Sequence, residues 1–136
     1  MTSSVTLTTQ DHIELAGIYR HDGQEKIAIL LHMMPATKES WDSIANKLLE
    51  HGCASLAIDM RGHGESTMGG TFDYKTFTPE QQQAKRLDLE AALAWAREQG
   101  FDEAHTILIG ASIGANLSIR ALAAHPSRAL ASARSP

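Results

Sequence analysis

The chain has 136 residues and a net charge of −4, with 43% hydrophobic and 21% charged residues. This composition is typical of one soluble globular domain, and without a basic stripe it excludes nucleic acid as an expected partner. No apolar run approaches the roughly 20 residues that span a bilayer, and the N-terminus carries no signal-peptide pattern. We therefore expect a cytoplasmic protein with no membrane partner. A single cysteine, Cys53, excludes an internal disulfide and is expected to be buried.

The first half of the chain predicts three strands and a helix. Residues 5–8 and 13–19 alternate apolar and polar side chains around a polar turn, which is typical of an antiparallel hairpin. Residues 27–31 form a continuous apolar run, the pattern of a strand buried on both faces. Apolar residues then recur at helical spacing over residues 41–49, which predicts a helix that ends near Gly52.

The second half of the chain predicts two further strands, each followed by a helix. Residues 54–58 form a second buried strand, and a polar loop follows it. Thr78-Pro79-Glu80-Gln81 is a typical helix start, with Thr as the N-cap, Pro in the first turn and Gln at the third position. We expect this helix to end at Gly100. Its predicted apolar face consists of Ala84, Leu87, Ala91, Ala94 and Trp95. Residues 106–109 predict a third buried strand, and residues 113–123 a last helix.

This order predicts an α/β fold with a mostly parallel sheet, an antiparallel N-terminal hairpin and flanking helices, in one domain over residues 1–136. Residues 126–136 consist largely of Ala, Ser, Arg and Pro and contain no β-branched residue, so we expect an irregular tail there. The strand at residues 106–109 would then form the edge of the sheet, with unpaired backbone groups. We therefore expect self-association through residues 106–109.

A candidate nucleophile lies in Gly110-Ala111-Ser112-Ile113-Gly114. This segment follows a predicted strand and opens a predicted helix, so Ser112 occupies the apex of a sharp turn. The two glycines let the strand and the helix approach each other closely. The helix N-terminus directs its free N–H groups and the positive end of its dipole at the apex, where they would stabilise an oxyanion. These features indicate a nucleophile for acyl transfer.

Three segments resemble the α/β-hydrolase family. Residues 31–35, Leu-His-Met-Met-Pro, are similar to the family's loop after the third strand, commonly His-Gly-x-Pro. Residues 59–66, Asp-Met-Arg-Gly-His-Gly-Glu-Ser, are similar to the run D-x-R-G-x-G-x-S after the fourth strand, and residues 110–114 to the nucleophile elbow. The lack of a long insertion and the pair Ala115-Asn116 are similar to the dienelactone hydrolase and acyl-esterase branch. The resemblance extends to near residue 125 and covers the first half of the family fold, so the last strands of that fold are missing.

The resemblance implies a serine hydrolase that acts on small carboxylic esters or related acyl substrates through an acyl-enzyme on Ser112. It also implies an oxyanion hole formed by the backbone N–H groups of Ile113 and Met34. His32 and Met33 are expected to belong to the binding site, although Met33 stands where the family often has Gly. A second interpretation of Met33 and Met34 is packing around an apolar acyl pocket.

The histidine and the acid that the family places after the nucleophile are absent from this sequence. The residues after Ser112 contain no Asp or Glu and one histidine, His125, which a helix would place roughly 20 Å from the serine at about 1.5 Å per residue. His32 and His63 follow predicted strands and are the two candidates for a substitute base, but we interpret both as loop-packing residues. The other histidines and the cysteine show no metal-ligand spacing, so we expect no metal and no cofactor.

Two earlier acids are expected to be structural. We expect Asp59 to accept backbone donors in the turn at Arg61-Gly62, and Asp88 to lie on the long helix away from the candidate site. Three hypotheses stay open. The chain is a truncated serine hydrolase, or a catalytically inactive fragment or module that binds an acyl ligand or a partner, or an unrelated α/β binding domain with an accidental serine turn.

Overall fold

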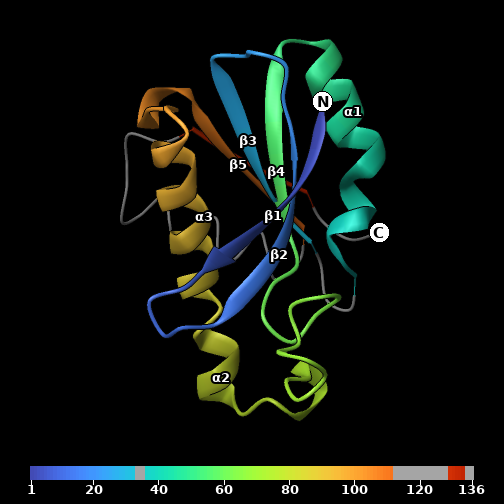
Figure 1. Ribbon diagram of the computed structural model, residues 1–136, viewed down its shortest axis with the longest axis vertical. Helices are drawn as coiled ribbons and strands as arrows, with labels where there is room; N and C mark the ends of the chain where they lie inside the picture. The colour runs from blue at the N-terminus through green and yellow to red at the C-terminus, as the bar shows by residue number, and fades with distance from the viewer. Residues whose placement is uncertain (33–35, 112–128, 134–136) are drawn as a thin grey trace.

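In a computed structural model, the protein folds into a six-stranded sheet with helices on both faces (Figure 1). The structure describes residues 1–32, 36–111 and 129–133, with the backbone alone for residues 111 and 129–133. The strands are β1 (Thr2–Thr8), β2 (Glu14–Arg20), β3 (Lys26–Leu31), β4 (Cys53–Ile58), β5 (Thr106–Ala111) and β6 (Ala129–Ala133). The α-helices are α1 (Asp42–Glu50), α2 (Pro79–Gln83) and α3 (Arg86–Glu98), and the 3-10 turns are η1 (Lys38–Trp41), η2 (Tyr74–Thr76) and η3 (Glu103–His105).

The sheet has the order β1-β2-β4-β3-β5-β6 and is mixed. β1 pairs antiparallel with β2, and β2 antiparallel with β4, whereas β4, β3, β5 and β6 run parallel to one another. The predicted α/β class, the N-terminal hairpin and the mostly parallel sheet are therefore confirmed. All six residues of β4 and five of the six in β3 are buried, as continuous apolar runs predict for central parallel strands.

The prediction of an irregular tail is wrong for residues 129–133, which form β6. This strand pairs in parallel with β5 from Ile107↔Ala129 to Ala111↔Ala133. β5 is consequently flanked by β3 on one side and β6 on the other, and is not the edge of the sheet. Self-association through residues 106–109 was expected because the backbone groups of an edge strand are unpaired. In the structure β6 pairs with this side of β5, so that reason no longer applies. The predicted helix over residues 113–123 lies outside the described residues.

Helices α1 and α3 cover opposite faces of the sheet (Figure 1). The larger cluster of buried side chains packs under α3, where Leu89 and Leu93 meet side chains of β3 and β4. The smaller cluster packs under α1 and contains Trp41, Ala45 and Cys53, so the expected burial of the cysteine is confirmed. No helix in the described part of the chain is long and apolar enough to cross a membrane.

The helix predicted from Thr78 to Gly100 begins as expected but is divided in two. Thr78 and Gln81 form a complete capping box, in which each side chain accepts from the other residue's backbone N–H. The helix breaks at Ala84 and Lys85, so α2 ends before α3 begins. The predicted apolar face is correct only in part, because its residues are half-buried, with Trp95 packed against the core. The inward face of this region consists of Lys85, Asp88, Leu89, Ala92, Leu93 and Ala96. Two of these residues carry charge, which is why hydropathy alone selected a different face.

Candidate active site

The sequence motifs meet where the parallel strands end, which we call the carboxyl edge of the sheet. Leu31 of β3 is in register with Ile58 of β4 and with Gly110 of β5, so the loops after the three strands start side by side. In an open parallel sheet this edge is the usual place for a ligand site. Ser112, the predicted nucleophile, follows β5 directly. Ser112, Ile113, Met33 and Met34 themselves lie outside the described residues, so their assigned roles stay predictions.

Asp59 organises the loop over residues 59–66 that follows β4. Its fully buried carboxylate accepts hydrogen bonds from the backbone N–H groups of Lys38 (2.8 Å) and Glu65 (2.9 Å). Asp59 therefore satisfies backbone donors as expected, although these belong to Lys38 and Glu65 and not to the turn at Arg61-Gly62. Gly64 has a φ of +50°, and a Cβ there would lie within 2.6 Å of the Asp59 carboxyl atoms. Glycine is thus required for the loop to close over the carboxylate.

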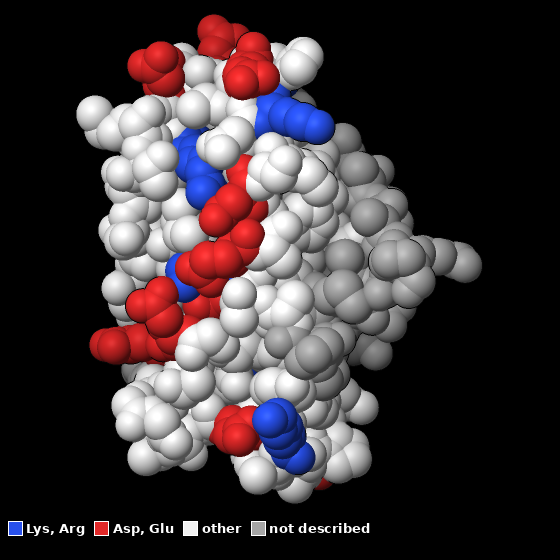
Figure 2. All heavy atoms as spheres, turned by 90° about the vertical axis from the view of Figure 1, so that its right-hand side faces the viewer, with Lys and Arg blue, Asp and Glu red and all other residues white. Residues whose placement is uncertain are grey.

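Lys38 is a buried cation that the sequence analysis did not identify. Its ammonium donates to Asp59 (2.7 Å) and Glu65 (2.6 Å), and it forms an ion pair with Glu39 at 3.0 Å. Burial would lower the pKa of Lys38, but the hydrogen bonds that its ammonium donates to Asp59, Glu65 and Glu39 outweigh burial and raise the pKa. Figure 2 shows acidic side chains gathered on the face of the molecule that carries η1 and α1. Lys38 joins η1 to the loop after β4 and so fixes one wall of the carboxyl edge.

Arg61 connects the same loop to α3 and to the β1–β2 hairpin. Its backbone N–H and its Nε both donate to the Asp88 carboxylate at 2.8 Å, and its two terminal nitrogens donate to Asp11 at 2.6 and 2.9 Å. The expectation that Asp88 lies away from the site is wrong, because this fully buried carboxylate binds the loop directly. Burial raises the pKa of Asp88 to about 6, although the charge and hydrogen bonds of Arg61 act to lower it. The hydrogen bond from Arg61 lowers the pKa of Asp11 to about 2.

His32 and His63 are both buried at the carboxyl edge, with ring centroids 4.7 Å apart. The Nε2 atom of His32 accepts the backbone N–H of Met60 at 3.0 Å. The His63 ring stacks on Tyr74 at 4.2 Å, and its Nε2 lies 2.9 Å from the Nζ of Lys85. Burial and the charge of Lys85 lower the pKa of His63 to about 3. The burial and contacts of both rings support their interpretation as packing residues. The lowered pKa of His63 also does not suit it for a general base, which needs a pKa near the working pH.

Lys85 is the second buried cation that the sequence analysis missed. It has no solvent exposure, and its Nζ lies 5.9 and 5.8 Å from the ring centroids of Tyr74 and Phe77. Burial lowers the pKa of Lys85 to about 8, which leaves an ammonium at neutral pH. Hydropathy gives no signal for a lysine of this kind, since its hydrogen-bond partner, His63, lies 22 residues away in the chain.

Two grooves among the described residues lie at the opposite end of the sheet, which we call the amino edge. One groove of about 430 Å³ runs between the β2–β3 connection and the α3–β5 connection, and another of about 460 Å³ lies beside the end of α1. His21 and His105 line the first groove. Among the described residues, no three His, Cys, Asp or Glu side chains converge to hold a metal ion.

Comparisons with known proteins give the same family as the motifs. Residues 28–133 match the family described as alpha/beta hydrolase fold. A curated relative, the non-heme chloroperoxidase CPO-A1 of Kitasatospora aureofaciens, is 30% identical over 74 residues, which are 54% of this chain and 26% of the relative. Among solved structures, the esterase Pf2001 of Pyrococcus furiosus has 26% identity and a TM-score of 0.78 over 94% of this chain and 46% of its own.

Two further solved structures share the fold at lower identity. The α/β hydrolase GrgF from Penicillium sp. sh18 has 24% identity and a TM-score of 0.82 over 98% of this chain and 46% of its own. Epoxide hydrolase A from Mycobacterium thermoresistibile has 22% identity and a TM-score of 0.74 over 97% of this chain and 39% of its own. The chain spans about a quarter of the curated relative and less than half of these structures. Since the family pattern covers most of its residues, the protein belongs to the α/β-hydrolase fold family.

Proposed function

We propose that the protein is a serine hydrolase of the dienelactone hydrolase and acyl-esterase branch, acting on small carboxylic esters or related acyl compounds. The observation that carries the proposal is the register of β5 with β3, in which Gly110 lies beside Leu31. This register brings the start of the serine turn next to the start of the His32-Met33-Met34 loop. The similarity to the Pyrococcus furiosus esterase supports an ester as the substrate class.

In this proposal the Ser112 hydroxyl attacks the substrate carbonyl, and the backbone N–H groups of Ile113 and Met34 stabilise the oxyanion. The proposal assigns His32 and Met33 to the site that binds the acyl group. The serine needs a base oriented by an acid, and His32 and His63 are engaged elsewhere. The proposal therefore assigns the base and the acid to residues beyond these 136, in keeping with relatives about twice as long.

A second candidate function is a module that binds an acyl ligand without hydrolysing it. The burial and the hydrogen bonds of His32 and His63 favour this candidate, since they leave Ser112 without an evident base among the described residues. An oxyanion hole without its base and acid can still retain roughly 10³-fold catalysis over water. The two candidates therefore differ in the rate of covalent chemistry at Ser112.

A fluorophosphonate probe separates the two candidates, because it reacts with an activated serine. The 136-residue chain, its Ser112→Ala variant and an exposed-serine control, Ser40→Ala, are treated with the probe and followed by intact mass. Labelling that is lost in Ser112→Ala and kept in Ser40→Ala supports the hydrolase. No labelling in the unaltered chain favours the binding module, and labelling that persists in Ser112→Ala contradicts the assignment of Ser112 as the nucleophile.

A further inference from the structure

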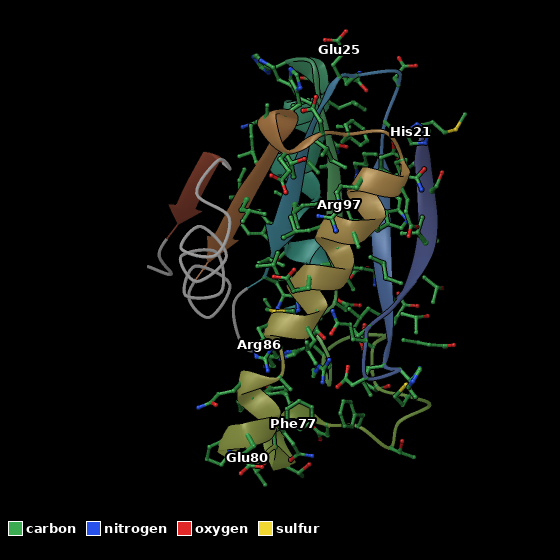
Figure 3. The ribbon with its side chains drawn as sticks, turned by 90° about the vertical axis from the view of Figure 1, so that its left-hand side faces the viewer. His21, Glu25, Phe77, Glu80, Arg86 and Arg97 are labelled. Carbon is green, nitrogen blue, oxygen red and sulfur yellow. The ribbon has the colours of Figure 1, made fainter. Side chains whose placement is uncertain are left out.

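Strand β1 forms one lateral side of the sheet, and β6 forms the other (Figure 3). Among the described residues β2 is the one strand that pairs with β1, so the backbone groups on the outer side of β1 have no ladder. Charged side chains, prolines and bulges are common means of protecting such an exposed strand from other chains. The seven residues of β1 include no charge and no proline, and their register with β2 runs without a bulge.

Hydrogen bonds at the two ends of β1 show which of its backbone groups point outward. The backbone N–H of His21 donates to the carbonyl of Met1 at 3.0 Å, and that of Thr9 donates to the carbonyl of Ile13 at 2.9 Å. Both pairs continue the register of β1 with β2. Hydrogen-bonded and non-bonded pairs alternate in an antiparallel ladder, so the odd-numbered residues of β1 bond to β2. The backbone groups that point away from the sheet therefore belong to Thr2, Ser4, Thr6 and Thr8.

The side chains of β1 divide between two faces with different properties. The even-numbered side chains are exposed hydroxyls, which can pair with one another across two strands. The odd-numbered Val5 and Leu7 pack against the core on the face that α3 covers. On that face a groove of about 270 Å³ lies between β1 and α3, with Leu7 and Trp95 in its wall. A strand added beside β1 would meet hydroxyls on one face and this groove on the other.

The sequence of β1 is complementary to itself in the antiparallel orientation. A two-fold axis at Val5 places Thr2 opposite Thr8 of a second copy, and Ser4 opposite Thr6. Each of these pairs joins two residues whose backbone groups point outward, so each pair can exchange two hydrogen bonds. Because β1 carries no charge, the pairing brings no like charges together. Self-pairing in this register therefore satisfies every outward backbone group of the strand.

The same register gives a partner to Met1, whose side chain is 77% exposed. As an odd-numbered residue, Met1 lies on the same face as Leu7. Met1 of the second copy would stand opposite Thr9 and diagonal to Leu7, a distance that long side chains can span. The exposed methionine of each copy would then contact the groove beside Leu7 of the other copy, and both apolar surfaces would lose contact with water.

We propose that β1 is a self-association surface, through which two copies of the chain pair antiparallel and join their sheets into one. The contact is isologous, so it closes at two copies. One strand from each copy makes a small interface, and interfaces below about 1,200 Å² are typical of weak and transient complexes. The dimer is consequently weak, with a dissociation constant in the micromolar range. The inference is independent of the proposed function, because no residue assigned to the candidate active site lies on β1.

Sedimentation velocity of the 136-residue chain between about 1 and 300 µM tests the association. The average mass is expected to rise to that of two copies and no further. Thr6→Lys puts a charge on the outer strand and is expected to weaken the association at least about tenfold. Gln83→Lys adds the same charge at an exposed position of α2 and is expected to associate like the unaltered chain. A chain that stays monomeric, an assembly larger than two copies, or equal association of the two variants overturns the proposal.

Amide hydrogen exchange identifies the strand that pairs. The N–H groups of Ser4 and Thr6 have no ladder partner in one copy, so their exchange is expected to be at least about tenfold slower at the highest concentration than at the lowest. The N–H of Val5 bonds to β2 in both states and serves as the internal reference. Unchanged exchange at Ser4 and Thr6 in a sample that has dimerised would place the contact elsewhere and overturn the proposal.

A mixture of two charge variants tests the register. Ser4→Lys and Thr6→Asp each place like charges diagonally across the two-fold axis, so each variant is expected to stay monomeric by itself. In an equimolar mixture the introduced charges have opposite sign and lie directly opposite each other, and a dimer of one chain of each kind is expected to form. A mixture that remains as monomeric as its components overturns the antiparallel register about Val5.

Discussion

The charged residues compared here differ in burial between the two edges of the sheet. At the carboxyl edge, Lys38, Asp59, Arg61 and Asp88 are buried and each makes several polar contacts. At the amino edge, Asp102 is exposed and bonds to His105 within its own 3-10 turn. Figure 3 shows the two ends of the molecule, with His21 and Glu25 toward one and Phe77 and Glu80 at the other.

The contrast shows which edge has its loops joined by buried charges. A buried charge is tolerated when its partners compensate for lost hydration, so a network of this kind fixes the loops that it joins. The contacts at the carboxyl edge join η1, the loop after β4, α3 and the β1–β2 hairpin. Two grooves lie at the amino edge, whereas the contacts between buried charges described above lie at the carboxyl edge.

The largest expected effect is that of Asp88→Asn. The amide replaces an acceptor oxygen with a donor, so either the backbone N–H or the Nε of Arg61 loses its partner in the interior. Breaking a buried ion pair from one side costs about 3–5 kcal/mol, and we expect that loss in the free energy of unfolding. Urea denaturation at pH 7.5 measures it, with the exposed Asp22→Asn as control. Equal midpoints for the two variants would show that the buried network does not hold the carboxyl edge.

The second expected effect is a loss of stability in acid that depends on His63. Its pKa is about 3 in the folded protein and near 6.5 in the unfolded chain, so as the pH falls below 6.5 the unfolded chain binds the proton first. The stability that the neutral ring contributes is present above pH 6.5 and decreases toward pH 3. Between pH 7 and 4 this amounts to about 3 kcal/mol.

The variant His63→Phe isolates this contribution, because it keeps a ring on Tyr74 and cannot titrate. The difference in unfolding free energy between pH 7 and 4 is expected to be about 3 kcal/mol smaller in the variant. Asp88 acts in the opposite direction, since its raised pKa favours the folded protein at low pH, but it is present in both proteins. Parallel pH curves for the variant and the unaltered chain would contradict the assigned pKa.

Two glycines with the same backbone conformation provide the third test. Gly62, at the carboxyl edge, has a φ of +79°, and a Cβ there would lie 2.6 Å from the backbone nitrogen of Tyr74 and from the Phe77 ring. Gly23, at the amino edge, has a φ of +81° and nothing within 4 Å of that position. Alanine at either position is expected to lower the free energy of unfolding by about 1–2 kcal/mol, because a residue with a Cβ is strained in the left-handed conformation. We expect about 2 kcal/mol more in Gly62→Ala, from displacement of the segment at Tyr74. Urea midpoints compare the two variants directly, and equal losses would contradict close packing at the carboxyl edge.

Most of the fold could be predicted from the sequence because its signals are local. The apolar runs of β3, β4 and β5 and the capping box of α2 depend on neighbouring residues only. β6 could not be predicted in the same way, since a run of Ala and Ser has no strand preference and becomes a strand through its ladder with β5. β6 was therefore not predicted because its strand conformation depends on long-range pairing with β5.

The candidate site was predicted in its motifs but not in its supporting contacts. The run from Asp59 to Ser66 could be identified by its resemblance to a family pattern. The partners of that run could not, because Arg61 and Asp88 are 27 residues apart, and Lys38 and Asp59 are 21 apart. A charged residue on a helix is normally assigned to the solvent face, which misplaced Asp88 and left Lys85 unnoticed. Buried charges with distant partners are therefore what hydropathy misses at this site.

The smallest expected effect is that of Asp102→Ala at the amino edge. Asp102 accepts the backbone N–H and the Nδ1–H of His105, and these hydrogen bonds lower its pKa. Because the carboxylate is exposed, water replaces both contacts when the side chain is removed. We expect a shift of the urea midpoint smaller than in any variant above, together with faster amide exchange at His105. The cap-preserving Asp102→Asn is expected to restore slow exchange, since its side-chain oxygen still accepts that N–H. A loss of stability as large as that of Asp88→Asn would mean that the amino edge is held as firmly as the carboxyl edge, and the distinction between the two edges would fail.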